Sequence, residues 1–172
     1  MNNNFIKNIL TDLKVELMDE FDRNFERKAF FDQPWPEVSI ANKRGSLLMR
    51  SGALRRSLRA QVSNSSIHFS SSMSYARIQN DGGTIQVTSK MKKYFWAMFY
   101  KSAPKSRSGK SVKVSAEASY WKAMALKRVG DKVTIRSRRF IGHHPQVDVA
   151  VRHVIEDNFK EIDLYIKSHL KR

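Results

Sequence analysis

Cysteine is absent from the 172-residue chain, and this absence excludes several kinds of chemistry at once. A chain without thiols forms no disulfide bonds, has no thiolate metal ligands and has no cysteine nucleophile. A reducing compartment such as the cytoplasm suits such a chain. Long apolar runs are absent too, since none reaches the roughly 18 consecutive apolar residues of a spanning helix. The start, Met1–Phe5, has no basic residue before an apolar run. We therefore expect neither an export signal nor a membrane span.

Acidic residues are scarce in the middle of the chain. The 32 Lys and Arg residues against 16 Asp and Glu give a formal charge of +16. Residues 38–143 carry 22 of the cations but only 3 of the acids, so this segment alone is +19. Residues 1–37 are −3 and residues 144–172 are neutral. A positive field concentrated in this way favours a polyanionic partner, either nucleic acid or an acidic protein surface.

The hydrophobic fraction of 41% is enough for one folded core, and the length fits a single domain over residues 1–172. Apolar residues at steps of three and four predict a long amphipathic helix over about 4–29 and a second one that begins at Pro145. Two prolines end the first helix in the loop 32–36, which Trp35 is expected to anchor. The first apolar face comprises Phe5, Ile6, Ile9, Leu10, Leu13, Leu17, Phe21 and Phe25. The second comprises Val147, Val151, Val154, Ile155, Phe159, Ile162 and Ile166.

Short strands are expected between these two helices. A hairpin of residues 59–63 and 66–70 surrounds the turn-forming pair Asn64-Ser65, and further strands are predicted at 84–88 and 132–137. Ser51 is placed to cap a short helix through Leu54 and Leu58. A short helical or irregular piece at 75–79 leads to a sharp turn at Gly82-Gly83.

An inserted helical arm at about 90–128 completes the predicted architecture. Helices at 90–100 and 116–128 are joined by a Ser- and Lys-rich basic loop at 102–113. The fold class is therefore α+β, with long N- and C-terminal helices packed on a small, mostly antiparallel sheet and with a helical basic insert.

Sequence motifs that would indicate an enzyme or a cofactor site are weak. Residues 105–111 resemble the end of a phosphate-binding loop, but Pro104 stands at the first glycine position and no apolar strand precedes it. A metal site at His143, His144 and His153 is conceivable, yet no acidic or cysteine ligand has a matching spacing. The few acids of the middle form no acid/base pair, and no serine lies in Gly-x-Ser-x-Gly. We expect no enzymatic activity, no cofactor and no metal.

Several segments carry a family resemblance. Leu48–Leu58 resembles the signature "leucine, then Thr/Ser-Gly-x-Leu-Arg-x-Ser" of phage virion morphogenesis proteins, the tail completion family of Mu-like phages. Four further segments match in the family's order: Trp35-Pro36, Tyr75–Gln79 with Gly82-Gly83, Val87–Met91 and Arg139–Gly142. Arg139 stands where the family usually has proline, and Gln79 stands at an expected histidine.

This resemblance implies a small structural protein at the head-to-tail junction of a virion, made in the host cytoplasm. It implies tail completion or head-tail joining, similar to connector and tail terminator proteins that work as rings. The implied partners are further copies of the chain, for example in a hexameric ring, tail tube or connector proteins, and DNA passing through a channel. The alternative function is a basic nucleic-acid-binding module, which the charge of the middle segment favours.

Two sets of site residues follow. The expected structural signature positions are Gly52, Leu54, Tyr75, Gly82, Gly83 and Phe140. The expected contacts to a partner or to DNA are Arg55, Arg56, Arg59, Lys90, Lys92, Lys93, Lys105, Arg107, Lys110 and Lys113. Tyr94, Phe95 and Trp96 are available to stack on bases, but their helical spacing favours a place in the core.

Overall fold

The computed structural model describes residues 3–38, 47–103 and 114–170. Six helices and six short strands lie within these ranges, so the predicted α+β class is confirmed. The elements in chain order are α1 (Asn3–Arg27), β1 (Ala29–Phe30), β2 (Gln33–Pro34), α2 (Ala53–Arg56), β3 (Leu58–Val62), β4 (Ile67–Ser71), α3 (Ala76–Asp81), β5 (Gly83–Gln86), α4 (Ser89–Ser102), α5 (Ala116–Leu126), β6 (Lys132–Ile135) and α6 (Pro145–Leu170).

The described strands form three separate two-stranded antiparallel sheets: β1–β2, β3–β4 and β5–β6. They do not merge into the one small sheet that we expected. The first two pairs are local hairpins, whereas β5 and β6 pair across the whole segment that contains α4 and α5. A physical reason is length, because strands of two to five residues bury little surface and each pair packs on its nearest helix instead.

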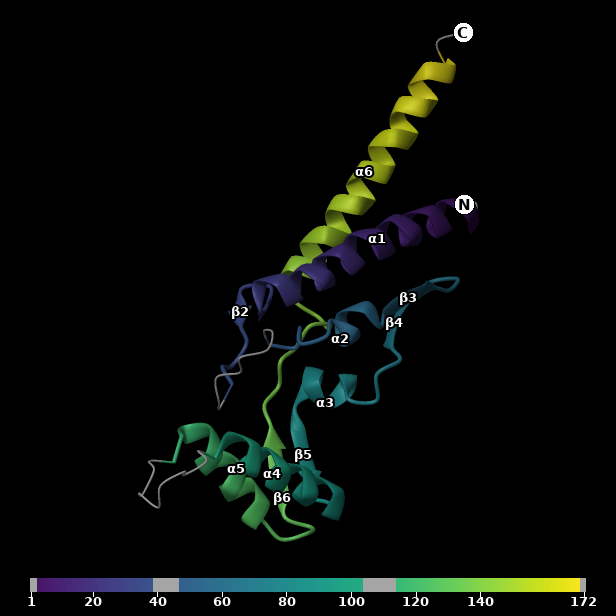
Figure 1. Ribbon diagram of the computed structural model, residues 1–172. Helices are drawn as coiled ribbons and strands as arrows, with labels where there is room; N and C mark the ends of the chain where they lie inside the picture. The colour runs from purple at the N-terminus through teal and green to yellow at the C-terminus, as the bar shows by residue number, and fades with distance from the viewer. Residues whose placement is uncertain (1–2, 39–46, 104–113, 171–172) are drawn as a thin grey trace.

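The molecule is elongated and has two parts (Figure 1). We call residues 3–38, 47–81 and 136–170 the body and residues 83–103 and 114–135 the lobe. The body contains α1, α6 and the β3–β4 hairpin, and the lobe contains α4 and α5 packed together beside β5 and β6. The two termini lie near the end of the body that is remote from the lobe.

Three clusters of buried apolar side chains form the cores of these two parts. In the body, one cluster joins α1 to β1, to the β3–β4 hairpin and to the first half of α6, with Leu13, Leu17 and Phe21 at its centre. A second cluster of the body contains Phe25, Trp35, Leu54, Leu58, Ala76 and Phe140. The lobe has its own cluster around Val87 and Phe95, together with residues of α5 and β6. The lobe therefore has an apolar core of its own.

Helix α6 contacts the rest of the protein through its first half only. Val147, Val151 and Val154 pack against the core, as the predicted face requires. The face then continues past α1: Phe5 of α1 packs on Phe159, and residues 159–170 are all exposed. Within the described residues, Ile162 and Ile166 therefore do not join a core cluster as expected, because α6 extends past the first turns of α1. No helix in the described ranges combines the length and the apolarity needed to cross a membrane.

Helix α2 is shorter than predicted. It comprises only Ala53–Arg56, and Leu58 already belongs to β3. The residue at its N-cap is Gly52, with φ of 66°, and not Ser51. The Ser51 hydroxyl accepts a hydrogen bond from the Ala53 amide at 3.3 Å. A left-handed glycine turns the chain so sharply that the preceding serine lies outside the cap position.

Candidate functional site

Four of the five segments that resemble the phage family meet in one place in the body, whereas Val87–Met91 lies in the lobe. Trp35, Leu54 and Phe140 are buried in the same apolar cluster, together with Ala76, which follows Tyr75. The Trp35 ring packs edge-on against Phe25, and its indole N–H donates to the Arg139 carbonyl at 2.6 Å. This contact confirms Trp35 as the anchor of its loop. Positions more than 100 residues apart thus form one packing unit.

Two asparagines fix this unit by hydrogen bonds to the backbone. The Asn80 side-chain oxygen accepts from the amides of Phe140 and Ile141 at 2.9 and 3.1 Å. The fully buried Asn24 donates to the Phe140 carbonyl at 3.2 Å and accepts from the Phe31 amide at 2.8 Å. Segment 138–141 is therefore held from both α1 and α3. Neither asparagine was among the predicted signature positions.

The paired glycines adopt the predicted positive φ, 74° at Gly82 and 141° at Gly83. A Cβ atom on Gly82 would lie 2.8 Å from the Ser137 backbone nitrogen, so any side chain at this position would also collide with the backbone. At Gly83 the nearest atom would be 3.7 Å away, which is an ordinary contact. Tyr75, in contrast, is 43% exposed and borders a groove described below.

Arg55, a predicted partner contact, is engaged inside the chain. Its guanidinium forms ion pairs with Asp22 and with Glu26, the latter at 2.7 Å, and these pairs fasten α2 to α1. Both carboxylates raise the pKa of Arg55 above its ordinary value through hydrogen bonds. We therefore assign Arg55 a structural role. Arg56 and Arg59 are exposed, and they donate to the nearby backbone carbonyls of Ser51 and Arg56, respectively.

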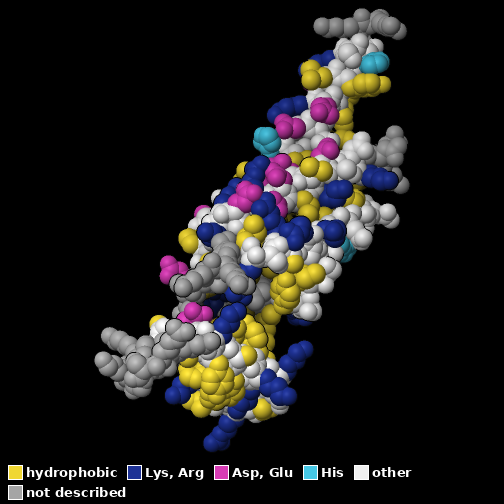
Figure 2. Space-filling view, in the orientation of Figure 1, with side chains coloured by type: hydrophobic (Ala, Val, Ile, Leu, Met, Phe, Trp, Pro, Cys, Tyr) yellow, Lys and Arg dark blue, Asp and Glu magenta, His cyan; other side chains and the backbone are white. Residues whose placement is uncertain are grey.

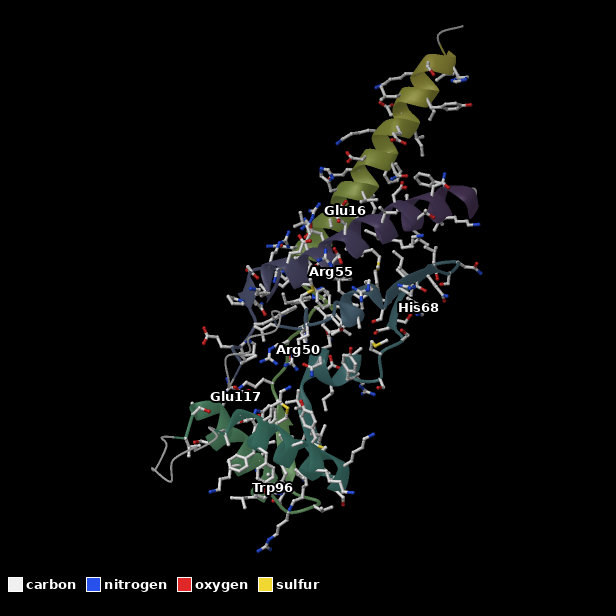
Figure 3. All side chains as sticks on the ribbon, viewed as in Figure 1. Glu16, Arg50, Arg55, His68, Trp96 and Glu117 are labelled. Atoms are coloured by element: carbon white, nitrogen blue, oxygen red, sulfur yellow. The ribbon has the colours of Figure 1, made fainter. Side chains whose placement is uncertain are left out.

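The other predicted cations lie on the lobe, away from these arginines. Lys90 and Lys93 of α4 are exposed and Lys92 is half-buried. The basic loop, with Lys105, Arg107, Lys110 and Lys113, lies outside the described residues. Figure 3 shows the separation, since Arg55 lies beside α1 and Trp96 lies on the lobe. The structure therefore divides the described contacts into two groups and does not make one continuous site.

The aromatic residues of α4 divide between the core and the surface. Phe95 is buried against Trp121, in agreement with the core assignment. Trp96 is half-buried and stacks on Tyr100, which is 67% exposed. Tyr94 is half-exposed as well. Figure 2 shows a group of apolar side chains on the lobe bordered by Lys and Arg. This surface combines exposed rings with cations.

A groove extends along the body to its boundary with the lobe, and we call it the interlobe groove. It consists of two adjoining cavities of about 550 and 340 Å³, which share Val38, Arg50, Gln79 and Arg138. Lys28 adds a cation to the first cavity and Arg136 adds one to the second. Two acids, Glu37 and Glu117, also line the second cavity. Figure 3 shows Arg50 between the two parts and Glu117 on the lobe.

The cations of this groove were not among the predicted site residues. Arg138 donates to the backbone carbonyls of Pro36 and Glu37, at 3.1 and 3.3 Å, and not to a carboxylate. Burial, with a smaller contribution from the charge of Arg136, lowers its pKa. Among the described residues, Lys28, Arg50, Arg136 and Arg138 form no ion pair. The available signal in the sequence was Arg136-x-Arg138 directly before a resembling segment.

The three histidines of the conceivable metal site have different surroundings. His144 is buried, stacks on Phe31 at 4.6 Å and has its Nε2 atom 2.9 Å from Asp32. His143 and His153 are exposed and each lies near one carboxylate. Within the described ranges, no three potential ligands come together as a metal-binding group.

Comparison of the chain with protein-family models, with curated proteins and with solved structures found no match.

Proposed function

We propose that this chain is a structural, non-enzymatic assembly protein of a tailed bacteriophage or prophage, which acts in tail completion or head-tail joining. The observation that carries the proposal is the convergence of four of the five resembling segments. Four residues that are far apart in sequence pack with Phe25 as one unit: Trp35, Leu54, Ala76 and Phe140. A shared set of motifs is more informative when its members support one another in space than when they are scattered.

The surface of the long helices supports an assembly role. Residues 159–170 of α6 project beyond the body with Leu164, Tyr165 and Leu170 more than 60% exposed. Apolar residues on one helix that has no partner within the described chain are typical of an interaction surface. Such a helix is suited to association with another protein of the assembly.

The charge distribution supports a ring. Residues 83–135, the lobe with its connecting loop, carry 12 Lys and Arg against 2 Asp and Glu, while α1 and α6 each have two more acids than bases. The lobe lies at one end of the molecule, apart from α1 and α6 (Figure 1). A head-to-tail contact between the lobe of one copy and α1 and α6 of the next would join opposite charges, and heterologous contacts of this kind can close into rings. The ring would stand at the head-tail junction, next to tail tube or connector proteins.

The test is a gene inactivation in the phage or prophage that encodes the chain. We expect lysates in which heads and tails remain separate in electron micrographs, and purified protein should restore joining in vitro. Light scattering on the purified protein should show an oligomer that dissociates as salt is raised, because screening weakens opposite charges. Intact virions without the gene would refute the function. A monomer at all salt concentrations would refute only the ring.

The second candidate is a nucleic-acid-binding module, favoured by the lobe surface with Tyr94 and Tyr100 beside Lys90 and Lys93. Exposed rings stack on bases while lysines contact phosphates. Binding of fluorescent oligothymidylate should fall steeply with salt and should weaken in Lys93→Glu. Lys7→Glu, which makes the same charge change on α1, is the control. Equal loss in both variants would indicate net charge alone and would reject a site on the lobe.

A further inference from the structure

The second cavity of the interlobe groove contains an open strand edge. Among the residues that the structure describes, strand β6 pairs with β5 on one side only, and four consecutive residues, Val133 to Arg136, line the cavity. No residue of β5 lines it. The edge that faces the groove is therefore the free edge of β6.

The register identifies which backbone groups face the groove. Opposite Val87, the chain forms a bulge: the Val87 amide donates to the Asp131 carbonyl, and the Gly130 amide donates to the Val87 carbonyl, both at 2.9 Å. Bonding alternates along an antiparallel ladder, so Val133 and Ile135 point their backbone groups at Ile85 and Gly83. The amides and carbonyls of Lys132, Thr134 and Arg136 then point the other way. No further backbone bond of residues 132–136 is found among the described residues.

Cations surround this edge. Arg136 continues the strand, and Arg50 and Arg138 lie across the cavity. The Trp121 indole N–H donates to the Glu117 carboxylate at 3.4 Å, and the backbone carbonyl of Glu37 accepts from Arg138. Among the described residues, none of the three guanidinium groups forms an ion pair with a carboxylate. Met98, Tyr120 and Trp121 provide apolar contacts.

We propose that the interlobe groove binds an extended acidic segment of a partner protein, which adds to the free edge of β6 as an antiparallel or parallel strand. The backbone of the segment would complete the ladder, its carboxylates would pair with Arg50, Arg136 and Arg138, and alternate apolar side chains would contact the lobe. A nucleic acid would satisfy the cations but has no amide and carbonyl pattern for the strand. This binding is independent of ring formation and of the proposed assembly role.

The test uses the full chain and a fluorescein-labelled octapeptide of alternating glutamate and valine, blocked at both ends. Anisotropy should show saturable binding. Thr134→Pro removes an amide of the free edge and should weaken binding at least about tenfold. Thr84→Pro is the matched control, since Thr84 lies directly opposite on β5 with its amide on the other free edge. Its binding should stay unchanged. Circular dichroism checks the folding of both variants.

Two further comparisons keep the result decisive if a proline variant unfolds. Arg136→Glu should weaken binding, whereas Arg77→Glu, an equal charge change at an exposed position of α3, should not. Methylation of the peptide's backbone nitrogens should abolish binding. The proposal is overturned if the octapeptide does not bind or if the methylated peptide binds equally well. It is also overturned if oligothymidylate displaces the peptide and the binding of oligothymidylate does not change in Arg136→Glu.

Discussion

Single polar side chains join segments of the body that are distant in sequence. Asn24 bridges α1 to residues 31 and 140, and Asn80 holds the amides at 140 and 141. Such bonds are directional, so they fix how the chain crosses the core, whereas apolar contacts alone would tolerate sliding. The body therefore depends on a few residues whose type is not obvious from hydrophobic patterning.

Replacement of Asn24 by alanine should be strongly destabilising. It leaves the Phe31 amide and the Phe140 carbonyl buried without partners, at a cost of roughly 2–4 kcal/mol in the free energy of unfolding. Urea unfolding followed by circular dichroism measures this change. Asn158→Ala, which removes a surface amide bonded to Asp12, is the control and should change stability by less than about 0.5 kcal/mol. Equal effects would contradict the assigned role.

Two glycine substitutions should distinguish the backbone strain of a positive φ from the steric clash of an added Cβ atom. Gly82→Ala combines a positive φ with a Cβ only 2.8 Å from the Ser137 nitrogen, while Gly130→Ala has φ of 95° and open space around it. Strained φ costs about 1–3 kcal/mol by itself, so Gly82→Ala should lose distinctly more stability than Gly130→Ala. Thermal melts of the two variants provide the comparison. The reverse order would show that the backbone relaxes at Gly82.

At the scale of elements, periodicity predicted the helices well because each depends on local sequence. The first helix was expected over 4–29 and comprises Asn3–Arg27, and α6 begins at Pro145 as expected. The hairpin β3–β4 is within one residue of its predicted bounds. The two-residue strands β1 and β2 were missed, since they are too short for any alternation to show.

Pairings between distant elements could not be predicted in the same way. The β5–β6 ladder joins residues 83–86 to 132–135, and no local pattern identifies that partner. The cations of the interlobe groove come from three separate segments of the chain and meet only in the folded structure. Arg55 illustrates the opposite case: its charge suggested an external partner, but α1 supplies Asp22 and Glu26.

The exposed end of α6 should determine self-association or partner binding more than stability. Ile162→Glu combined with Ile166→Glu removes apolar surface that contacts nothing in the core clusters. The free energy of unfolding of the subunit should change by less than about 1 kcal/mol. The mass measured by light scattering should fall towards that of a monomer. Glu161→Ile, which adds an apolar residue on a neighbouring position of α6, is the control and should not dissociate the oligomer.

For the whole molecule, the central fact is that body and lobe have separate apolar cores and are linked through the chain segments that enter β5 and leave β6. On the body side of this link, the Arg138 amide and the Ser137 hydroxyl donate to the carbonyls of Gln79 and Asn80 and hold the two segments together. A perturbation inside one core should therefore remain local.

Phe95→Ala tests this independence. The cavity left in the lobe should cost about 3–5 kcal/mol locally. Hydrogen exchange measured by mass spectrometry should increase in α4 and α5, while α1 and α3 keep their protection. Phe21→Ala makes the same change in the body and should give the opposite distribution. Faster exchange throughout the molecule in both variants would mean that the two parts unfold as one unit.

The packing of α1 on α6 also has a consequence for synthesis on the ribosome. The apolar face of α1 is made well before its partner residues from Val147 to Val154. At about 5–20 residues per second, Leu13 precedes Val151 by about 7–30 seconds, during which α1 lacks its partner in α6. We infer that the part of this face that α6 covers stays accessible to chaperones until α6 is made, and that premature termination before Pro145 yields an aggregation-prone product.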